Sequence, residues 1–153
     1  MRKAAALALL GASGALAVAL VAQYGFGLAP CQMCHWQRWP YFAALPLALA
    51  ALRWPSRWLI GALAALFALD AGVAVFHAGV EWKWWTGITE CSGGGLQATS
   101  VEALTAQIMG APVVRCDEPA LVVLGLSMAG WNALLATALS ATLAIAALRP
   151  RRG

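Results

Sequence analysis

Long uncharged stretches, separated by a few charged positions, are the dominant pattern along this chain. No Asp, Glu, Lys or Arg occurs within residues 4–37, 39–52, 58–69, 71–80 or 119–148. A helix needs about 20 apolar residues to cross a bilayer, so this pattern predicts membrane-spanning helices. We expect four of them, at approximately residues 4–22, 33–52, 58–78 and 121–148.

The second expected span depends on where its helix begins. The uncharged stretch 39–52 is too short to cross a bilayer as a helix. It reaches spanning length only if the helix begins near Cys31, which places Cys34 and Arg38 in its first turns. The third span has Asp70 in its interior.

The basic residues predict how the spans are oriented. Seven of the ten lie at span ends that share one side of the membrane: Arg2, Lys3, Arg53, Arg57, Arg149, Arg151 and Arg152. Basic residues concentrate on the cytoplasmic side, so both termini are expected there. The outer side then carries a short loop, residues 23–32, and a long loop, residues 79–120. The prediction is an all-α membrane protein, a single domain over residues 1–153 built as a four-helix bundle.

The N-terminus permits a second interpretation. Arg2 and Lys3, the apolar run after them and the small residues 15–17 are also typical of a cleaved signal peptide. The apolar run continues without the polar region that normally precedes a cleavage site. A retained first span is therefore the favoured interpretation.

Composition supports a membrane protein and excludes other classes. The chain is 62% hydrophobic and 10% charged, against about 45–50% and 25% in soluble domains. These values exclude a soluble enzyme, a disordered chain and a solenoid. The net charge is +4, but the basic residues are scattered singly, so nucleic-acid binding is not expected.

All four cysteines fall on the expected outer side. Cys31 and Cys34 form a Cys-x-x-Cys motif at the start of the second span, and Cys91 and Cys116 lie in the long loop. An oxidising exterior favours disulfide chemistry, and a helix N-terminus stabilises a thiolate. Arg38, one turn after Cys34, either extends to lipid headgroups or stabilises an anion beside Cys34.

The cysteines are also compatible with two other uses. Residues 31–35, Cys-Gln-Met-Cys-His, match the spacing of c-type haem attachment. Against haem, the motif opens a transmembrane helix and leaves Cys91 and Cys116 without a role. Zinc bound by four cysteines is disfavoured because Cys91 and Cys116 are isolated in the sequence, so no metal is expected.

Further candidates lie in the third span and the long loop. Asp70 and His77 are seven residues apart and share a helix face, in either a structural or a functional role. Residues 99–109 have apolar positions at helical spacing, which predicts a short helix on the membrane surface or an ordinary packed loop helix. Such a helix would bring Cys116 close to Cys31.

The motif around the first cysteine pair resembles a known family. Residues 27–41, Gly-Leu-Ala-Pro-Cys-Gln-Met-Cys-His-Trp-Gln-Arg-Trp-Pro-Tyr, are similar to the signature of the disulfide-bond-formation protein B (DsbB) family. Residues 76–81 and 114–119 fit the same family. The resemblance extends over the whole chain, and its most specific part is Pro-Cys-x-x-Cys with Arg four positions later.

The resemblance implies a quinone-dependent oxidoreductase of the bacterial inner membrane. Such an enzyme reoxidises a periplasmic DsbA-like thiol oxidase of thioredoxin fold and passes the electrons to ubiquinone or menaquinone. It implies two redox disulfides, Cys31–Cys34 and Cys91–Cys116, with Cys91 attacked by the partner and Cys34 facing the quinone. Arg38 and His77 match positions of the quinone site, and Gln23 matches a frequent glutamine whose role the sequence leaves open.

Two alternatives of other kinds stay open at this point. One is a c-type haem-bearing electron-transfer subunit that uses the Cys31–His35 motif. The other is an exporter of reducing equivalents, which passes electrons in the opposite direction. Its cysteine pairs would reach a different equilibrium with redox buffers from those of a disulfide-generating enzyme.

Overall fold

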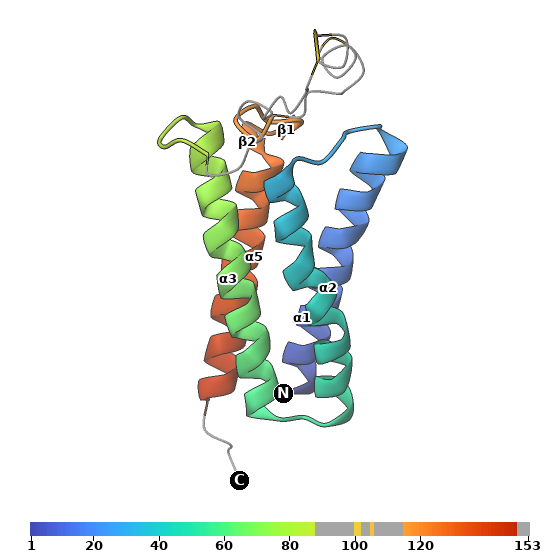
Figure 1. Ribbon diagram of the computed structural model, residues 1–153. Helices are drawn as coiled ribbons and strands as arrows, with labels where there is room; N and C mark the ends of the chain where they lie inside the picture. Colours follow the sequence, from blue (N-terminus) through green and yellow to red (C-terminus); the bar gives the residue numbers. More distant parts are fainter. Residues whose placement is uncertain (88–99, 102–104, 106–114, 150–153) are drawn as a thin grey trace.

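The described residues form a bundle of four long helices (Figure 1). The computed structural model describes residues 1–87, 100–101, 105 and 115–149. Helix α1 is Arg2–Leu20 and continues as a π-helical segment, η1, Val21–Gly25; α2 is Gln32–Arg53, α3 is Arg57–Glu81 and α5 is Met128–Leu148. A small antiparallel hairpin, β1 (Val122–Val123) and β2 (Leu126–Ser127), precedes α5.

Small side chains allow the helices to pack closely. Ala5, Ala8 and Ala12 repeat along one face of α1 and are fully buried. Ala44, Ala48 and Ala51 do the same on α2. Small residues at such spacing let two helix backbones approach, which is the usual basis of helix packing in a bilayer. The core of the bundle is completed by larger buried side chains from α3 and α5: Ile60, Leu63, Phe67, Leu139 and Leu143.

Three of the four helices are long and apolar enough to cross a membrane: α1 with η1, α3 and α5. Many of their large apolar side chains face outward, including Leu10 at 70% exposure and Leu69 at 69%. Helix α2 has 22 residues but is less apolar, because its first half contains Gln37 and Arg38. Gln37 is nevertheless buried and Arg38 is half-buried, so neither polar group is simply exposed on the outside of the bundle.

The last helix begins later than the span expected from residue 121. Leu124 and Gly125 adopt positive φ angles of 52° and 82°, which turn the chain into the hairpin. Two successive residues with positive φ suit a tight β-hairpin turn. Ser127 then caps α5 by accepting a hydrogen bond from the Gly130 backbone N–H at 3.1 Å. The apolar run is therefore divided between a hairpin and a helix.

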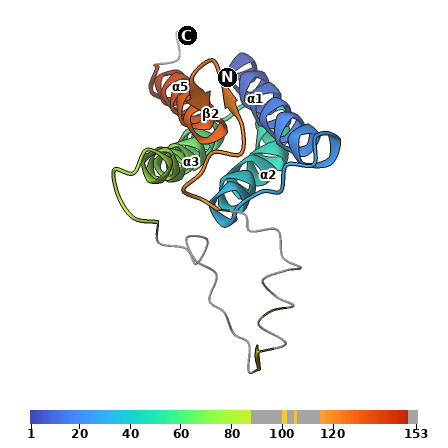
Figure 2. The same cartoon turned by 90° about the horizontal axis from the view of Figure 1, so that it is seen from above.

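The helix ends separate into two groups. The start of α1, the turn between α2 and α3, and the end of α5 lie at one end of the bundle, while the hairpin lies at the other (Figure 1). Viewed along the bundle, α1 is beside α2 and α3 is beside α5 (Figure 2). The pairs α3–α5, α1–α2 and α2–α3 pack most closely, and α1 and α5 meet only loosely.

Gly79 makes room for an aromatic stack at the end of α3. The Trp85 ring stacks on Phe76 at 5.6 Å between centroids, and its Nε1 donates to the Phe76 carbonyl at 2.8 Å. A Cβ on Gly79 would overlap the Trp85 ring. We expect Gly79→Ala to lower the free energy of unfolding by about 1–3 kcal/mol, a common cost of overpacking. Gly72→Ala is the matched control, because a Cβ there meets nothing. Equal thermal midpoints for the two variants would contradict this packing.

Candidate active site

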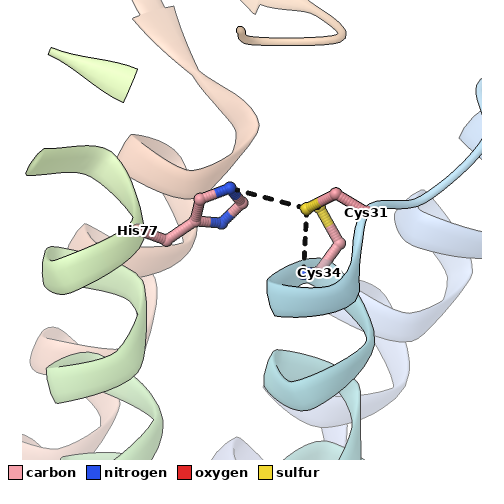
Figure 3. Close-up of side chains that lie close together, drawn as sticks. All are labelled: Cys31, Cys34 and His77. Atoms are coloured by element: carbon pink, nitrogen blue, oxygen red, sulfur yellow. Dashed lines mark hydrogen bonds between the residues drawn. The ribbon is translucent and has the colours of Figure 1, made fainter. Parts of the chain in front are cut away.

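Three reactive side chains meet at the N-terminus of α2 (Figure 3). The sulfur atoms of Cys31 and Cys34 are 2.8 Å apart. His77, from α3, places Nε2 3.6 Å from the Cys31 sulfur. Cys31 is the N-cap of α2, and its sulfur accepts a hydrogen bond from the Cys34 backbone N–H at 3.2 Å. The pair therefore lies where the unpaired N–H groups of a helix favour negative charge on sulfur.

Cys116 belongs to the same cluster. Its side chain is 2% exposed and packs with Cys31, Met33 and Val80. The Cys116 backbone also accepts a hydrogen bond from His77. The hydrogen bond with Cys34 and burial raise the pKa of the Cys31 thiol, and nearby Cys116 adds to the effect. The structure thus brings a long-loop cysteine to the Cys31–Cys34 pair.

Two elements of the sequence interpretation lie outside the described residues. Cys91 is one of them, so its pairing with Cys116 remains a prediction. The other is the expected helix over 99–109, of which only three positions are described. Among these, the Thr105 hydroxyl donates to the Val101 carbonyl at 2.8 Å.

Ion pairs tie the segment that carries Cys116 to the end of α3. The Lys83 amine donates to the Asp117 carboxylate at 2.7 Å and to its carbonyl at 2.8 Å. The Arg115 guanidinium donates to the same carboxylate at 2.8 and 3.0 Å. Arg115, and then Lys83, hold the pKa of Asp117 well below its usual range. Asp117 therefore joins the two ends of the long loop beside Cys116.

Arg38 is held by the first helix. Its Nη1 donates to Gln23 Oε1 at 2.5 Å, and its Nη2 donates to the Ala19 carbonyl at 3.4 Å. Gln23 lies in the π-helical segment η1. These bonds give Gln23 a role that the sequence left open, because they hold the guanidinium within the bundle, one turn from Cys34. Extension of Arg38 to lipid headgroups is not the arrangement seen.

A cavity of about 640 Å³ lies beside the cysteine pair. Its wall is mostly apolar and comes largely from α1 and α5, for example Gly14, Val18 and Leu135. The polar part of its lining, called the polar end of the cavity, includes these residues: Cys34, Gln37, Arg38, His77 and Glu81. A mostly apolar pocket with a few polar groups suits an amphipathic ligand with a polar ring and an apolar tail. A quinone fits this description.

A chain of hydrogen bonds runs from His77 into the bundle. The Gln37 amide nitrogen lies 2.8 Å from His77 Nδ1, and Asn132 Nδ2 donates to Gln37 Oε1 at 2.8 Å. Asn132 Nδ2 also donates to Asp70 Oδ2 at 3.1 Å, and the Tyr41 hydroxyl donates to Asn132 Oδ1 at 2.5 Å. Asp70 is fully buried and anchors this chain. Sequence reasoning missed Gln37, Asn132 and Tyr41; uncharged polar residues inside apolar spans were the available signal.

Glu81 differs from its expected place in the long loop. It is the last residue of α3, and its side chain is 6% exposed. Its Oε1 lies 3.8 Å from His77 Nε2, and its Oε2 has no hydrogen-bond partner among the described residues. Glu81 thus adds a buried carboxylate to the polar end of the cavity.

The cysteines and His77 also form a group with metal-ligand chemistry. The potential ligand atoms of Cys31, Cys34 and His77 all lie within 4.8 Å of one another. Metal binding requires an unprotonated ring nitrogen. The Gln37 amide nitrogen lies 2.8 Å from His77 Nδ1, and Nε2 is the ring nitrogen that faces the sulfurs. A metal ion at this group would therefore require Nε2 of His77 to carry no proton.

Comparisons with known proteins agree with this chemistry. The family model described as "Disulfide bond formation protein DsbB" matches residues 1–146. The chain is also similar to "Uncharacterized protein RP370" of Rickettsia prowazekii (strain Madrid E), with 28% identity over 129 residues, covering 79% of this chain and 73% of that protein. No solved structure matches. The haem alternative gains no support from these findings. Proteins of the DsbB family have membrane helices and are oxidoreductases that act in disulfide formation. Because the family match covers nearly all of the sequence, the chain belongs to this family.

Proposed function

We propose that this protein reoxidises a periplasmic, DsbA-like dithiol oxidase of thioredoxin fold and passes the electrons to a membrane quinone. One observation carries the proposal: the Cys31–Cys34 pair opens onto an apolar cavity whose polar end also presents Arg38 and His77. A thiol pair at the wall of an apolar cavity can exchange electrons with a lipid-soluble acceptor. A pair exposed only to water would not meet such an acceptor.

The proposed setting is the bacterial inner membrane, with all four helices crossing it. The bundle end that carries Arg2, Arg53 and Arg57 faces the cytoplasm, as the bias of basic residues favours. Helix α2 is included because its 22 residues run beside α1 and α3. The cysteine cluster is at the other end, and therefore on the periplasmic side.

The first exchange takes two electrons from the partner. A partner thiolate attacks Cys91 in a Cys91–Cys116 disulfide, which gives a mixed disulfide and releases Cys116 as a thiolate. The second partner thiol then attacks its neighbour and releases Cys91, so the partner leaves oxidised and the loop pair is reduced. This order follows the family resemblance for Cys91 and Cys116.

The second exchange passes the electrons to the helix pair. The Cys116 thiolate attacks the Cys31 sulfur of a Cys31–Cys34 disulfide, and Cys34 leaves as a thiolate. Cys91 then attacks Cys116, which restores the loop disulfide and leaves Cys31 reduced as well. The burial of Cys116 against Cys31 supports this contact. The raised pKa of the Cys31 thiol supports Cys34 as the thiolate of the pair.

The final step re-forms the Cys31–Cys34 disulfide. A quinone supplies a two-electron, two-proton acceptor, so one dithiol yields one disulfide and one quinol. Cys34 lines the cavity, and Arg38 lies one turn further along α2, where its charge favours anions. His77 and Glu81 are the groups at the polar end that can hold or exchange protons. Ubiquinone and menaquinone both fit an apolar wall of this kind.

Arg38 is expected to affect the quinone more than the protein partner. We expect Arg38→Ala to raise the KM for quinone about 10- to 100-fold, the value of one hydrogen bond to a charged group. The KM for the reduced partner should change little, since Arg38 contacts α1 and the cavity. Gln23→Ala should give a smaller effect in the same direction. Steady-state kinetics with each substrate varied separately measures both constants.

Arg53→Ala is the control for loss of an arginine, because Arg53 lies at the opposite end of α2 over the Trp54 ring. Its quinone KM should match that of the wild type. A quinone KM that is unchanged in Arg38→Ala, or a larger change in the partner KM, would contradict the role of Arg38.

A further inference from the structure

We infer that Asp70, Asn132 and Gln37 form a relay that fixes the tautomer of His77, so that His77 donates a hydrogen bond where the cysteines meet. The catalytic consequence of this inference rests on the proposed function. The tautomer itself is a property of the resting protein and depends on neither quinone nor partner.

The relay begins at Asp70. This side chain is fully buried on α3, and the inferred relay takes it as the carboxylate, which can only accept hydrogen bonds. Its Oδ2 lies 3.1 Å from Asn132, so the nitrogen of the Asn132 amide must face it. On the other side of the amide, the Tyr41 hydroxyl donates to Asn132 Oδ1 at 2.5 Å. Because a hydroxyl can also accept, the Asp70 contact is the one that fixes the orientation of Asn132, and the Tyr41 contact is consistent with it.

The orientation of Asn132 passes to His77 through Gln37. An amide nitrogen carries two protons, and the second one of Asn132 goes to Gln37 Oε1 at 2.8 Å. The Gln37 nitrogen is thereby turned toward His77 Nδ1, 2.8 Å away. Because an amide nitrogen only donates, Nδ1 must accept. The proton of the neutral imidazole is then on Nε2.

The protonated nitrogen points at the reactive groups. His77 Nε2 lies 3.6 Å from the Cys31 sulfur (Figure 3). It is also 3.8 Å from Glu81 Oε1, and His77 hydrogen-bonds the Cys116 backbone. Each of these partners can accept a hydrogen bond. During the proposed exchange, negative charge appears on sulfur at this point, and a donor held in place stabilises it. Asp70, Asn132 and Gln37 are then positioning residues that act through His77.

Exchanging two residues of the relay should reverse it. The double variant Asp70→Asn, Asn132→Asp keeps the side-chain shapes and the total charge. It moves the carboxylate, which can only accept, from the start of the hydrogen-bond series to its middle. Gln37 must then donate to residue 132, which turns its oxygen toward His77. An amide oxygen only accepts, so the proton of His77 should move to Nδ1.

Nitrogen-15 NMR of histidine reads the tautomer directly. The chain has two histidines, and His35→Gln removes the exposed one from the spectrum. In this background we expect His77 to show a protonated Nε2 and an unprotonated Nδ1, with the reverse in the double variant. Gln37→Glu is a second, single test, because a carboxylate opposite Nδ1 requires a proton there. Ser140→Ala, which removes a partly buried hydrogen bond to the Ala64 carbonyl elsewhere in the bundle, should keep the wild-type tautomer.

The tautomer should also control the rate. Transfer from the loop pair to quinone should slow about 10- to 100-fold in the double variant, the value of one hydrogen bond to a charged group, with an unchanged KM for the partner. A proton on Nδ1 in the wild type, an Nδ1 without a proton in both the double variant and Gln37→Glu, or an inverted tautomer with a full rate would each overturn the inference. A protein with the expected tautomers that reduces no quinone supports the relay and overturns the proposed function instead.

Discussion

Replacing Cys31 with serine is expected to produce a new visible absorption band when quinone is bound. Cys34 then has no partner with which to close its disulfide and persists as a thiolate at the N-terminus of α2. Cys34 also lines the cavity, so an electron-rich sulfur faces an electron-poor ring. Such a pair absorbs visible light by charge transfer. Absorption spectra of the purified variant, with and without quinone, measure the band.

Arg38 and Cys34 supply the controls for this spectrum. Adding Arg38→Ala to the Cys31→Ser variant should weaken the band and raise the pH at which it appears, because the positive charge that favours the thiolate is lost. Cys34→Ser should show no band, since the sulfur at the cavity wall is gone. A band in Cys34→Ser, or one that is indifferent to Arg38, would mean that the roles of Cys31 and Cys34 are wrongly assigned.

Replacing Cys116 with serine is expected to trap the protein partner on this chain. In the wild type the partner attacks Cys91 and forms a mixed disulfide. This mixed disulfide is normally broken by attack of Cys116 or of the second partner thiol. Without Cys116 the loop disulfide cannot form, so the Cys91 thiolate instead attacks the disulfide of an oxidised partner molecule. This attack forms a Cys91–partner disulfide and releases the second partner cysteine as a thiolate, and Cys116 is no longer there to displace the partner. Nonreducing gel electrophoresis of cells that express both proteins should show a stable adduct that reducing agent dissolves.

Cys91→Ser is the matched control for the trap. That variant lacks the proposed docking thiol, so it should give no adduct of this kind. Absence of the adduct in a folded Cys116→Ser protein would show that Cys91 is not the docking thiol. Equal adducts in both variants would show that the partner does not distinguish the two cysteines.

Much of the helical framework could be predicted from the sequence because charge is excluded from a bilayer. The uncharged stretches locate α1, α3 and most of α5, and the resemblance to the DsbB family is confirmed by the match over residues 1–146. The start of α2 followed from length alone: a helix over 39–52 was too short, and the structure has it begin at Gln32, with Cys31 as its cap. The hairpin at 122–127 was hidden, because an apolar run does not distinguish a strand from a helix.

The polar interior of the site could not be predicted in the same way. Counting charges finds Asp70 and Arg38 but overlooks Gln37 and Asn132, which are uncharged. Their contacts also join different helices: Asn132 on α5 meets Gln37 on α2, and no spacing within one helix reveals such a pair. Gln23 is likewise separated from Arg38 by a turn of the chain. Long-range packing, which a single sequence does not display, decides these contacts.

Quinone reduction by the purified protein tests the proposed function most directly. The protein, embedded in lipid, is mixed with a reduced thioredoxin-fold dithiol oxidase and a quinone, and the quinone absorbance is followed while thiols are counted. We expect one quinone to be reduced for each partner disulfide formed, and no turnover in Cys34→Ser. Oxidation of the partner without loss of quinone, or quinone reduction that persists in Cys34→Ser, would contradict electron flow through the Cys31–Cys34 pair.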